Sequence, residues 1–421
     1  MNVGISRRRL MQTAGIAALA SEAGAAAVMP PPRFEGKDTP KIALSAGDGG
    51  YIGIGGGRGA RDGREGRGGG APGGAQPGAP ANPPAPPADS ARRIRQLGVE
   101  WVLAGGPPIP WDETQLKALM DRFKPNGLTL GNLMIGGFNN AIYGRPGRDE
   151  EIEKVIASIK AAGKVGLPVV EYNWYAHRAM EGYFEEADDV RLGVGWTGFD
   201  YDHVRTPGSQ YSNSLRPEEA NMKFRDLPPL PNEGAHTLEE MWATITYFLK
   251  KVVPEAEKAG VRLALHPNDP PAPISRGSQQ IMGSVEGWKH LIEIVKSPAN
   301  GITFDCGVTH EMGQNPVEVC AYFASRDRIN HVHFRNVKVK KPYERYSEVM
   351  IDEGENNMFL VMKELVKHKY KLEIYPEHPR ALDYDRDRGP IGGYPGGGGY
   401  ASYAFQVGYT RAMMQAALMS V

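Results

Sequence analysis

Cysteine is nearly absent from this chain, which has two cysteines in 421 residues. Cys306 and Cys320 are too few to form a disulfide framework. Charge of one sign is not in excess either, since 49 Lys and Arg balance 49 Asp and Glu. A chain without net charge lacks the electrostatic attraction that draws proteins to nucleic acid or to an anionic membrane. The composition therefore argues against both as partners.

The N-terminal region has no apolar run long enough to span a bilayer. It has three successive arginines at positions 7–9, a short apolar stretch at 14–20 and small residues at 24–27. This order is typical of a secretory signal, and the arginines favour the twin-arginine type. We predict a signal peptide at residues 1–28, a single mature domain over residues 29–421 and a periplasmic or otherwise exported location. If the signal is not used, the location is cytoplasmic.

Glycine and proline, with 53 and 34 residues, are abundant. Both are concentrated in residues 47–87, where Gly-Arg-Gly runs give way to Ala-Pro-Pro repeats. Such a composition cannot bury a core, so we predict a flexible insertion after the first strand. Arg-Gly runs also occur in RNA-binding tails, but the predicted export and the balanced charge disfavour that interpretation.

Short β-branched runs alternate with amphipathic segments along the rest of the chain. Strands are predicted at residues 41–46, 99–103, 128–131, 168–173, 261–266, 301–305, 328–333 and 371–375. Helices are predicted at residues 90–97, 112–123, 148–165, 237–259, 285–295, 316–325, 357–368 and 403–419. A long loop is predicted from residue 174 to about 234. Eight strand-helix repeats favour an α/β fold that closes into a (β/α)₈ TIM barrel.

Four of the predicted strands end at residues that can bind metals. These residues are His266, Asp305 with Cys306, His333, and Glu377 with His378. In a barrel of parallel strands the carboxyl ends meet at one mouth, which holds the active site. We therefore predict a divalent-metal site at this mouth, and an enzyme that acts on a small molecule.

Two choices within this set stay open. Side chains alternate along a strand, so Asp305 and Cys306 are not expected to face the mouth together. Asp305 would suit Mn²⁺, Mg²⁺, Co²⁺ or Fe²⁺, whereas the Cys306 thiolate would favour a softer ion. His331 shares a strand face with His333 but lies one layer deeper. We expect His333 to be the ligand and His331 to pack beneath it.

Other residues near the strand ends suit substrate binding and proton transfer. The Arg335 guanidinium could bind a substrate carboxylate through two parallel hydrogen bonds, or form an ordinary salt bridge. His378 could act as an acid or a base, because imidazole titrates near neutrality. Tyr400 follows the glycine run at residues 396–399, which could be a mobile flap that carries a phenol to the site or a simple connector.

At these residues the chain resembles the mannonate dehydratases, metal-dependent members of the xylose-isomerase-like barrels. The resemblance runs from about residue 95 to residue 415. It is strongest in His-Pro-Asn-Asp-Pro-Pro at 266–271, Asn-Gly-Ile-Thr at 300–303 and Arg-Ile-Asn-x-x-His-x-Arg-Asn-Val at 328–337. It implies an enzyme that removes water from the sugar acid D-mannonate to give 2-keto-3-deoxygluconate.

The resemblance also implies roles for individual residues. The implied ligands of the metal, usually Mn²⁺ in this family, are His266, His333, Glu377 and the residue at 305 or 306. The catalytic His and Tyr of the family fall on His378 and Tyr400. The candidate substrate-binding residues are Arg335, Asn173 and Asn268.

The chain departs from the family pattern at three acidic residues. Asp305 and Glu171 each stand where the family has Cys, and Glu377 stands where it has Asp. Because of these acids, a metal-dependent sugar isomerase or epimerase on the same barrel remains an alternative hypothesis. Epimerases of this class use two carboxylates on opposite faces of the sugar. A third hypothesis is an exported sugar-binding module with a degenerate metal site. The sequence also leaves open whether the protein is a homo-oligomer.

Overall fold

The structure is a computed structural model that describes residues 35–46, 88–188, 191–204, 215–387 and 394–421. The predicted signal peptide, residues 1–28, and the predicted insertion, residues 47–87, lie outside the described residues. Among the described residues no helix is both long and apolar enough to cross a membrane.

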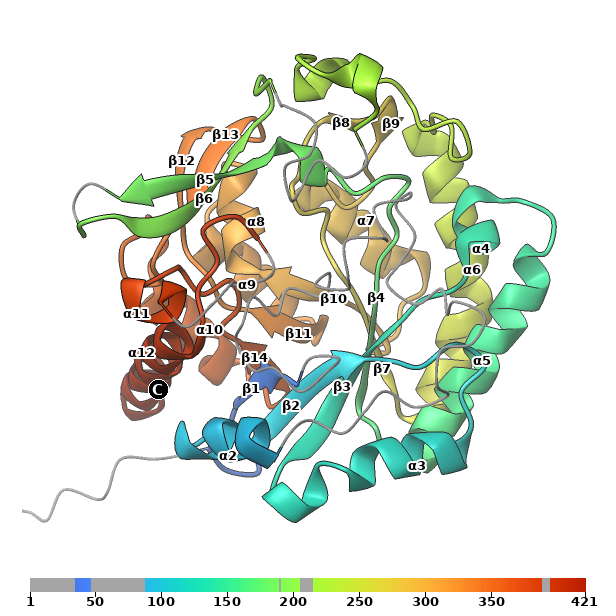
Figure 1. Cartoon of the computed structure of the whole chain (residues 1–421). Coiled ribbons are helices and arrows are strands. Elements are labelled where there is room, and N and C mark those ends of the chain that lie inside the picture. The colour runs from blue at the N-terminus through green and yellow to red at the C-terminus, as the bar shows by residue number, and fades with distance from the viewer. Residues whose placement is uncertain (1–34, 47–87, 189–190, 205–214, 388–393) are drawn as a thin grey trace, which may run out of the picture. The chain divides into compact units, whose positions relative to one another are not determined.

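Within the described residues, eight parallel strands pair into a closed barrel (Figure 1). Around the barrel their order is β1-β14-β11-β10-β7-β4-β3-β2. In chain order the strands are β1 Lys41–Ser45, β2 Trp101–Gly105, β3 Thr129–Ile135, β4 Val169–Tyr172, β7 Arg262–Leu265, β10 Asn300–Asp305, β11 Ile329–His333 and β14 Glu373–Tyr375. All eight predicted strands are present, and the predicted (β/α)₈ barrel is confirmed.

Helices surround this barrel (Figure 1). The predicted ones are α2 Ala88–Gln96, α3 Glu113–Asp121, α5 Arg148–Lys164, α6 Leu238–Ala259, α7 Val285–Ile294, α9 Pro316–Ala324, α10 Met358–Lys367 and α12 Tyr400–Ser420. Helix α6 shows which residues make helix boundaries predictable from sequence. The Thr237 side chain caps the first turn in a capping box with Glu240, and Gly260 ends the helix at φ 70°. Three short helices were not expected: α4 Asn139–Tyr143, α8 Cys306–Glu311 and α11 Asp383–Arg386.

A second, antiparallel sheet was missed by the sequence analysis. Its strands are β5 Tyr183–Asp188, β6 Val194–Asp200, β12 Val337–Lys341 and β13 Arg345–Glu348, in the order β12-β13-β6-β5. The prediction of one long loop over residues 174–234 was therefore wrong, since β5 and β6 lie within it. The sheet joins segments that leave the carboxyl ends of β4 and β11, so it lies beside the mouth of the barrel. The pairing of β6 with β13, which joins its two hairpins, links segments far apart in sequence and leaves no local pattern to detect.

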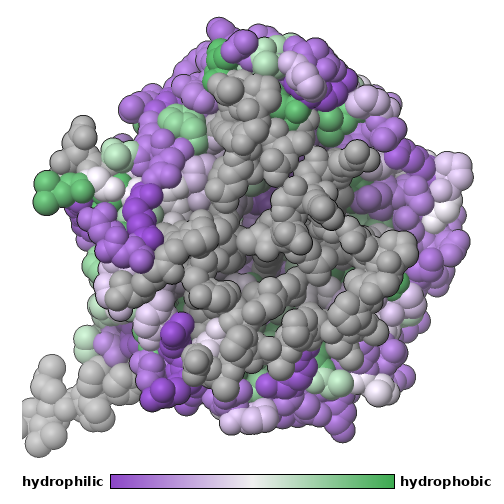
Figure 2. Space-filling view, in the orientation of Figure 1, coloured by the Kyte–Doolittle hydropathy of each residue, from purple (hydrophilic) through white to green (hydrophobic). Residues whose placement is uncertain are grey.

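The core and the surface follow from this arrangement. Parallel strands in a barrel are buried on both faces, and every residue of β10 is buried. The outer faces of the helices are polar: hydrophilic side chains predominate around the rim of the face in Figure 2, where described residues are visible. The mouth is different, because ionisable side chains are buried there.

Candidate active site

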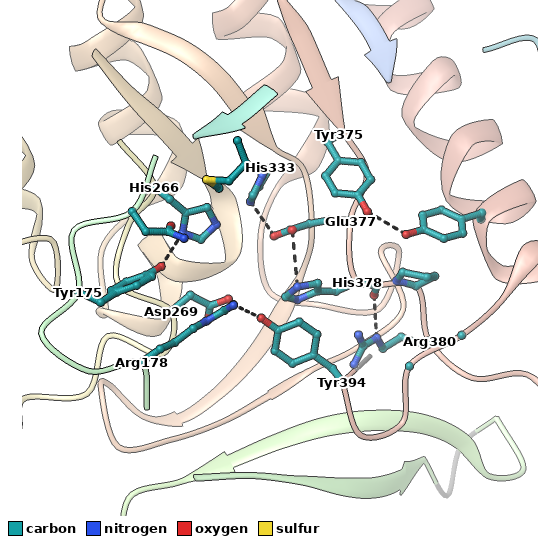
Figure 3. Close-up of a pocket in the computed structure, with 16 residues that line it drawn as sticks. Tyr175, Arg178, His266, Asp269, His333, Tyr375, Glu377, His378, Arg380 and Tyr394 are labelled. Atoms are coloured by element: carbon teal, nitrogen blue, oxygen red, sulfur yellow. Dashed lines mark hydrogen bonds and ion pairs between the residues drawn. The ribbon is translucent and has the colours of Figure 1, made fainter. Parts of the chain in front are cut away.

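Residues at the carboxyl ends of four neighbouring barrel strands lie close together, and those of β7, β11 and β14 line one pocket (Figure 3). The strands β7, β10, β11 and β14 are consecutive in the barrel, so their ends meet. Nδ1 of His333 lies 2.9 Å from Oε1 of Glu377 and 3.6 Å from Oδ2 of Asp305. The ring centroids of His266 and His333 are 4.9 Å apart. We call these four residues, His266, Asp305, His333 and Glu377, the metal-site cluster.

The metal-site cluster has the donor atoms and spacing that a divalent cation requires. Nδ1 of His333 and Oε1 of Glu377 are buried and have no hydrogen-bond partner among the described residues, although they are 2.9 Å apart. Ligand atoms that each lie about 2.1 Å from one ion are roughly 3 to 4 Å from one another. Two imidazoles and two carboxylates form a mixed nitrogen and oxygen set of the kind that holds divalent cations.

The electrostatics of the cluster favour positive charge. Burial opposes protonation of His333, but Glu377 and Asp305 raise its pKa to about 10. Burial also opposes ionisation of Glu377, but His333 and His378 hold the pKa of that carboxyl well below its usual value. A proton or a metal ion can supply the positive charge that these carboxylates attract.

His266 is held as a neutral ligand. Its Nδ1 lies 2.7 Å from the carbonyl oxygen of Pro267 and 2.9 Å from the hydroxyl of Tyr175. Burial, together with the neighbouring His333, lowers the pKa of His266 to about 3. With Nδ1 engaged, Nε2 is the nitrogen that remains to bind a metal, as in other sites where an outer hydrogen bond fixes the tautomer of the ligand.

The structure separates the two candidates at the end of β10. Asp305 directs Oδ2 toward His333, and its Oδ1 accepts a hydrogen bond of 2.9 Å from the backbone of Val308 at the start of α8. Cys306 is fully buried in the apolar core instead, where burial raises the pKa of its thiol well above the usual value. The geometry therefore favours Asp305 as the ligand.

Arg335 does not line the pocket. Its Nε lies 3.2 Å from Asp305, its Nη1 donates to Glu311 at 2.6 Å and its Nη2 lies 3.4 Å from Asp269. Of the two roles left open for this guanidinium, the geometry favours the salt bridge with carboxylates of the protein. Sequence alone could not show this, because Glu311 ends helix α8 and Asp269 lies in the loop after β7.

His378 lies in the pocket between two acids (Figure 3). Its Nδ1 is 2.8 Å from Oε2 of Glu348, and its Nε2 is 3.5 Å from Oε2 of Glu377. The backbone of His378 has a φ of 48°, which few residues other than glycine adopt. This turn follows β14 and orients the imidazole into the pocket, next to the metal-site cluster.

Tyr400 is not brought into the pocket. It is the first residue of α12, and its hydroxyl donates to the carbonyl oxygen of Arg93 at 3.3 Å. Tyr394, on the other side of the glycine run, lines the pocket, with its ring centroid 4.2 Å from that of His378. The sequence did not indicate which of the two tyrosines near the glycine run lines the pocket.

The two candidate asparagines differ in position. Asn173 follows β4 and lines the pocket. Asn268 is buried beneath the pocket, where its Oδ1 accepts a hydrogen bond of 2.8 Å from the backbone of Met282. Asn173 is therefore placed to reach a ligand, whereas Asn268 holds the loop that follows His266.

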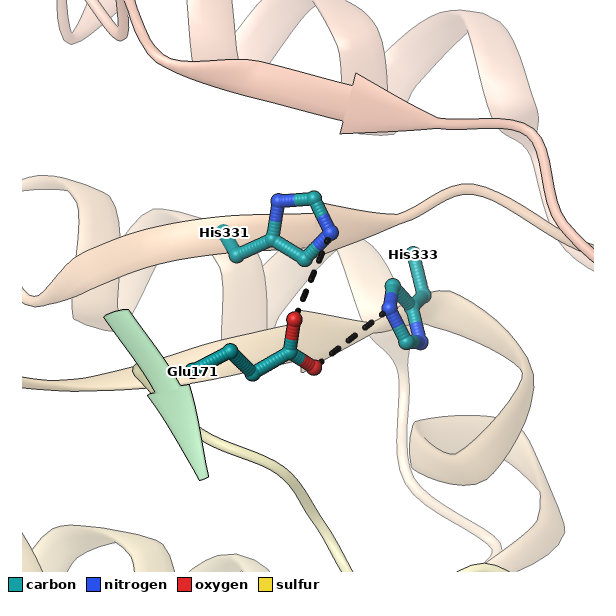
Figure 4. A group of neighbouring side chains, drawn as sticks. All are labelled: Glu171, His331 and His333. Carbon is teal, nitrogen blue, oxygen red and sulfur yellow. Dashed lines mark ion pairs between the residues drawn. The ribbon is translucent and has the colours of Figure 1, made fainter. Parts of the chain in front are cut away.

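Glu171 lies behind His333, inside the barrel (Figure 4). Its carboxylate is fully buried and lies 3.7 Å from Nε2 of His333 and 3.9 Å from Nε2 of His331. Asn132 on the adjacent strand β3 donates a hydrogen bond of 2.9 Å to Oε2 of Glu171. His331 lies one layer deeper than His333, as expected, and it faces this carboxylate.

The pocket lies beside the cluster at the mouth of the barrel. Besides the residues already described, its lining includes Tyr175, Arg178, Tyr375, Arg380 and Tyr403. Arg178 was not among the predicted site residues, because it falls in the segment that was predicted to be a loop.

The chain has relatives among characterised families. The family model described as D-mannonate dehydratase (UxuA) matches residues 88–419. The chain is 30% identical over 286 residues to a mannonate dehydratase of Streptococcus equi subsp. zooepidemicus, which covers 63% of this chain and 72% of that protein. It is 28% identical over 341 residues to a mannonate dehydratase of Thermotoga petrophila, with 72% and 89% covered.

Solved structures share the barrel. The crystal structure of mannonate dehydratase from Streptococcus suis serotype 2 superposes with a TM-score of 0.63 at 24% identity and covers 78% of this chain and 91% of that one. A xylose isomerase-like TIM barrel protein from Mycobacterium smegmatis, in complex with magnesium, has a TM-score of 0.52 at 12% identity, with 92% and 100% covered. At these identities the likeness is one of fold.

Proposed function

The chain belongs to the D-mannonate dehydratase family, and we propose that it removes water from D-mannonate, or from a related aldonic acid, to give 2-keto-3-deoxygluconate. The observation that carries this proposal is the family match over residues 88–419, which includes the pocket and the metal-site cluster. The mixed donor set of that cluster supports a metal-dependent reaction.

The reaction needs one group that removes a proton and another that delivers one. The substrate loses the hydrogen on C2 and the hydroxyl on C3 as water, and the resulting enol becomes the 2-keto group. His378 is placed to take the C2 proton on Nε2, because Glu348 lies 2.8 Å from Nδ1 and would stabilise the imidazolium that forms. The Glu348 carboxylate thereby orients the imidazole of His378 that acts as the base.

Tyr394 is placed to protonate the leaving hydroxyl. Burial raises the pKa of this phenol well above its usual value, so the phenol keeps its proton near neutral pH. Its ring lies against His378, which brings the two proton-transfer groups to one end of the pocket. This role replaces the one that the resemblance gave to Tyr400.

The cofactor that we propose is a divalent cation bound by His266, Asp305, His333 and Glu377, with Mn²⁺ the first choice. Fe²⁺, Co²⁺ and Mg²⁺ suit parts of the same nitrogen and oxygen donor set. Such an ion would polarise the substrate carboxylate and make the C2 proton easier to remove. The ionised Glu377 and the neutral His266 are in the protonation states that binding requires.

We also propose that the protein is exported to the periplasm by the twin-arginine route. The support is the order of arginines, apolar residues and small residues within residues 1–28. Export of an already folded enzyme would let it acquire its metal before it crosses the membrane. Cell fractionation of the full chain, and of a variant with Arg7, Arg8 and Arg9 replaced by lysine, tests this location.

The activity is tested with the purified protein, Mn²⁺ and D-mannonate. The proposal expects a 2-keto-3-deoxy acid to accumulate, with one water released for each substrate consumed. If no such product forms but an aldose is converted to a ketose, the isomerase or epimerase hypothesis replaces this one. If a sugar binds tightly and no sugar is converted, the protein is a binding module.

A further inference from the structure

Three arginine side chains lie at the mouth of the barrel, and they differ in their partners. Arg335 is surrounded by Asp305, Glu311 and Asp269. Arg380 has its Nη2 3.2 Å from Glu348. No ion pair joins Arg178 to a carboxylate anywhere in the part of the chain that the structure describes. Arg178 is thus the guanidinium of the three that forms no ion pair with an acid among the described residues.

The hydrogen bond and the ring contact of Arg178 are both with Tyr394, and Asp269 acts on its charge without forming an ion pair. Its Nη2 donates to the hydroxyl of Tyr394, and its guanidinium lies 5.8 Å from the centroid of that ring. The phenol stays protonated, since burial raises its pKa well above the usual value. Nε of Arg178 is buried and has no hydrogen-bond partner among the described residues. A charged group in such surroundings is costly unless an anion pairs with it.

The chain around Arg178 fixes where this side chain lies. Tyr175 lines the pocket and donates to the carbonyl oxygen of Pro267 at 2.8 Å. His177 is engaged elsewhere, with its Nε2 3.2 Å from Glu181. Glu181 is in turn bound by the buried Arg276 at 2.8 Å. These contacts hold the segment after β4 over the mouth, with Arg178 in the pocket wall (Figure 3).

We propose that Arg178 binds the carboxylate of the substrate and thereby selects a sugar acid over a neutral sugar. A guanidinium offers Nε and an Nη as two parallel donors that match the two oxygens of a carboxylate. Arg178 lines the same pocket as His266, Glu377 and His378, so an acid held there lies beside the groups assigned to the reaction. The inference rests on the proposed function in one respect, which is that the substrate is an acid. It gives Arg178 the carboxylate-binding role that was first expected for Arg335.

The test compares D-mannonate with D-mannonamide, which keeps the carbon skeleton and removes the negative charge. The Mn²⁺-loaded wild type and the Arg178→Gln, Arg178→Lys and Arg92→Gln variants are assayed for KM and kcat with D-mannonate. The amide is tested as a competitive inhibitor of each protein. Arg92 is an exposed residue of α2 and serves as the matched control.

We expect Arg178→Gln to raise the KM for D-mannonate about 10- to 100-fold, since hydrogen bonds between charged groups are lost. The inhibition constant of the amide should change less than about threefold, so the preference for the acid disappears. Arg178→Lys should retain part of this preference, because it keeps the charge and loses the paired donors. Arg92→Gln should behave as the wild type, and all four proteins should unfold at similar temperatures.

Two outcomes overturn the proposal. One is an unchanged KM for D-mannonate in Arg178→Gln, and the other is an equal loss of affinity for the acid and the amide, which would indicate a structural role. If the wild type does not dehydrate D-mannonate, the proposed function fails, and the acid and the amide are then compared by calorimetric binding. A preference for the acid that depends on Arg178 supports the inference in that case too, and its absence refutes it.

Discussion

Nε2 of His333 lies 3.7 Å from the buried carboxylate of Glu171, on the side of the ring away from Glu377. The imidazole therefore has an acid at each nitrogen, one in the metal-site cluster and one behind it. A carboxylate behind a metal-binding histidine fixes the tautomer of the ring and makes it a stronger ligand. Asn132 holds Glu171 in place through a hydrogen bond of 2.9 Å.

The first prediction concerns this carboxylate. Glu171→Gln should weaken Mn²⁺ binding about 10- to 100-fold, the usual effect of removing an outer partner of a ligand. The measurement is a calorimetric titration of the metal-free protein. Glu373→Gln is the control, because Glu373 is a buried acid at the amino end of β14, away from the cluster. Equal affinities in the wild type and Glu171→Gln would contradict this account.

The choice between Asp305 and Cys306 is tested by a pair of substitutions. Asp305→Asn should lower Mn²⁺ affinity by at least about 100-fold, because it removes one of two carboxylate ligands. Cys306→Ala should bind Mn²⁺ as the wild type does, with a modest loss of stability, since it shortens a buried side chain. The opposite ranking of the two metal affinities would show that the thiolate is the ligand.

The tyrosines that flank the glycine run give a third test. Tyr394→Phe should lower kcat for D-mannonate about 10²- to 10⁴-fold, the range expected when a proton donor is lost. Tyr400→Phe should leave kcat within about twofold, because its hydroxyl lies outside the pocket and its one weak bond is to a backbone carbonyl. A larger loss in Tyr400→Phe than in Tyr394→Phe would refute the role assigned to Tyr394.

His177 should make stability depend on pH. Burial opposes its protonation, but Glu181 and Glu233 raise its pKa to about 9. In the unfolded chain a histidine has a pKa near 6.5, so the protonated form stabilises the fold by roughly 3 kcal/mol below that pH. This contribution should be lost as the pH rises from about 6.5 through 9.

The measurement is the free energy of urea unfolding of the wild type and His177→Gln at several pH values. The difference between the two proteins should be largest near pH 6 and should fall by roughly 3 kcal/mol to a constant value above about pH 10. A difference that is the same at every pH would show that His177 is not charged in the folded protein.

The sequence was most informative where function depends on position within one strand. His266, His333 and Glu377 each end or follow a buried barrel strand, so their placement follows from the barrel alone. The position of a residue at a strand end could not be used in the same way for residues in long loops. Tyr394 and Tyr400 both flank a glycine run, and the start of α12 decides which one faces the pocket.

Contacts between distant segments were the other source of error. The guanidiniums of Arg335 and Arg178 look alike in sequence, yet Arg335 forms ion pairs with acids from β10, α8 and the loop after β7, whereas Arg178 forms none among the described residues. The antiparallel sheet brings Glu348 to His378, although the sequence analysis gave neither β13 nor Glu348 any role. Such partners are fixed by tertiary structure, and no local periodicity reveals them.

The central claim is that four side chains from consecutive barrel strands hold one catalytic cation. Anomalous diffraction from crystals grown with Mn²⁺ tests it most directly. A single strong peak about 2.0 to 2.3 Å from His266 Nε2, Asp305, His333 Nδ1 and Glu377 is the predicted result. A peak elsewhere, or no peak in crystals of protein that dehydrates D-mannonate, would contradict it.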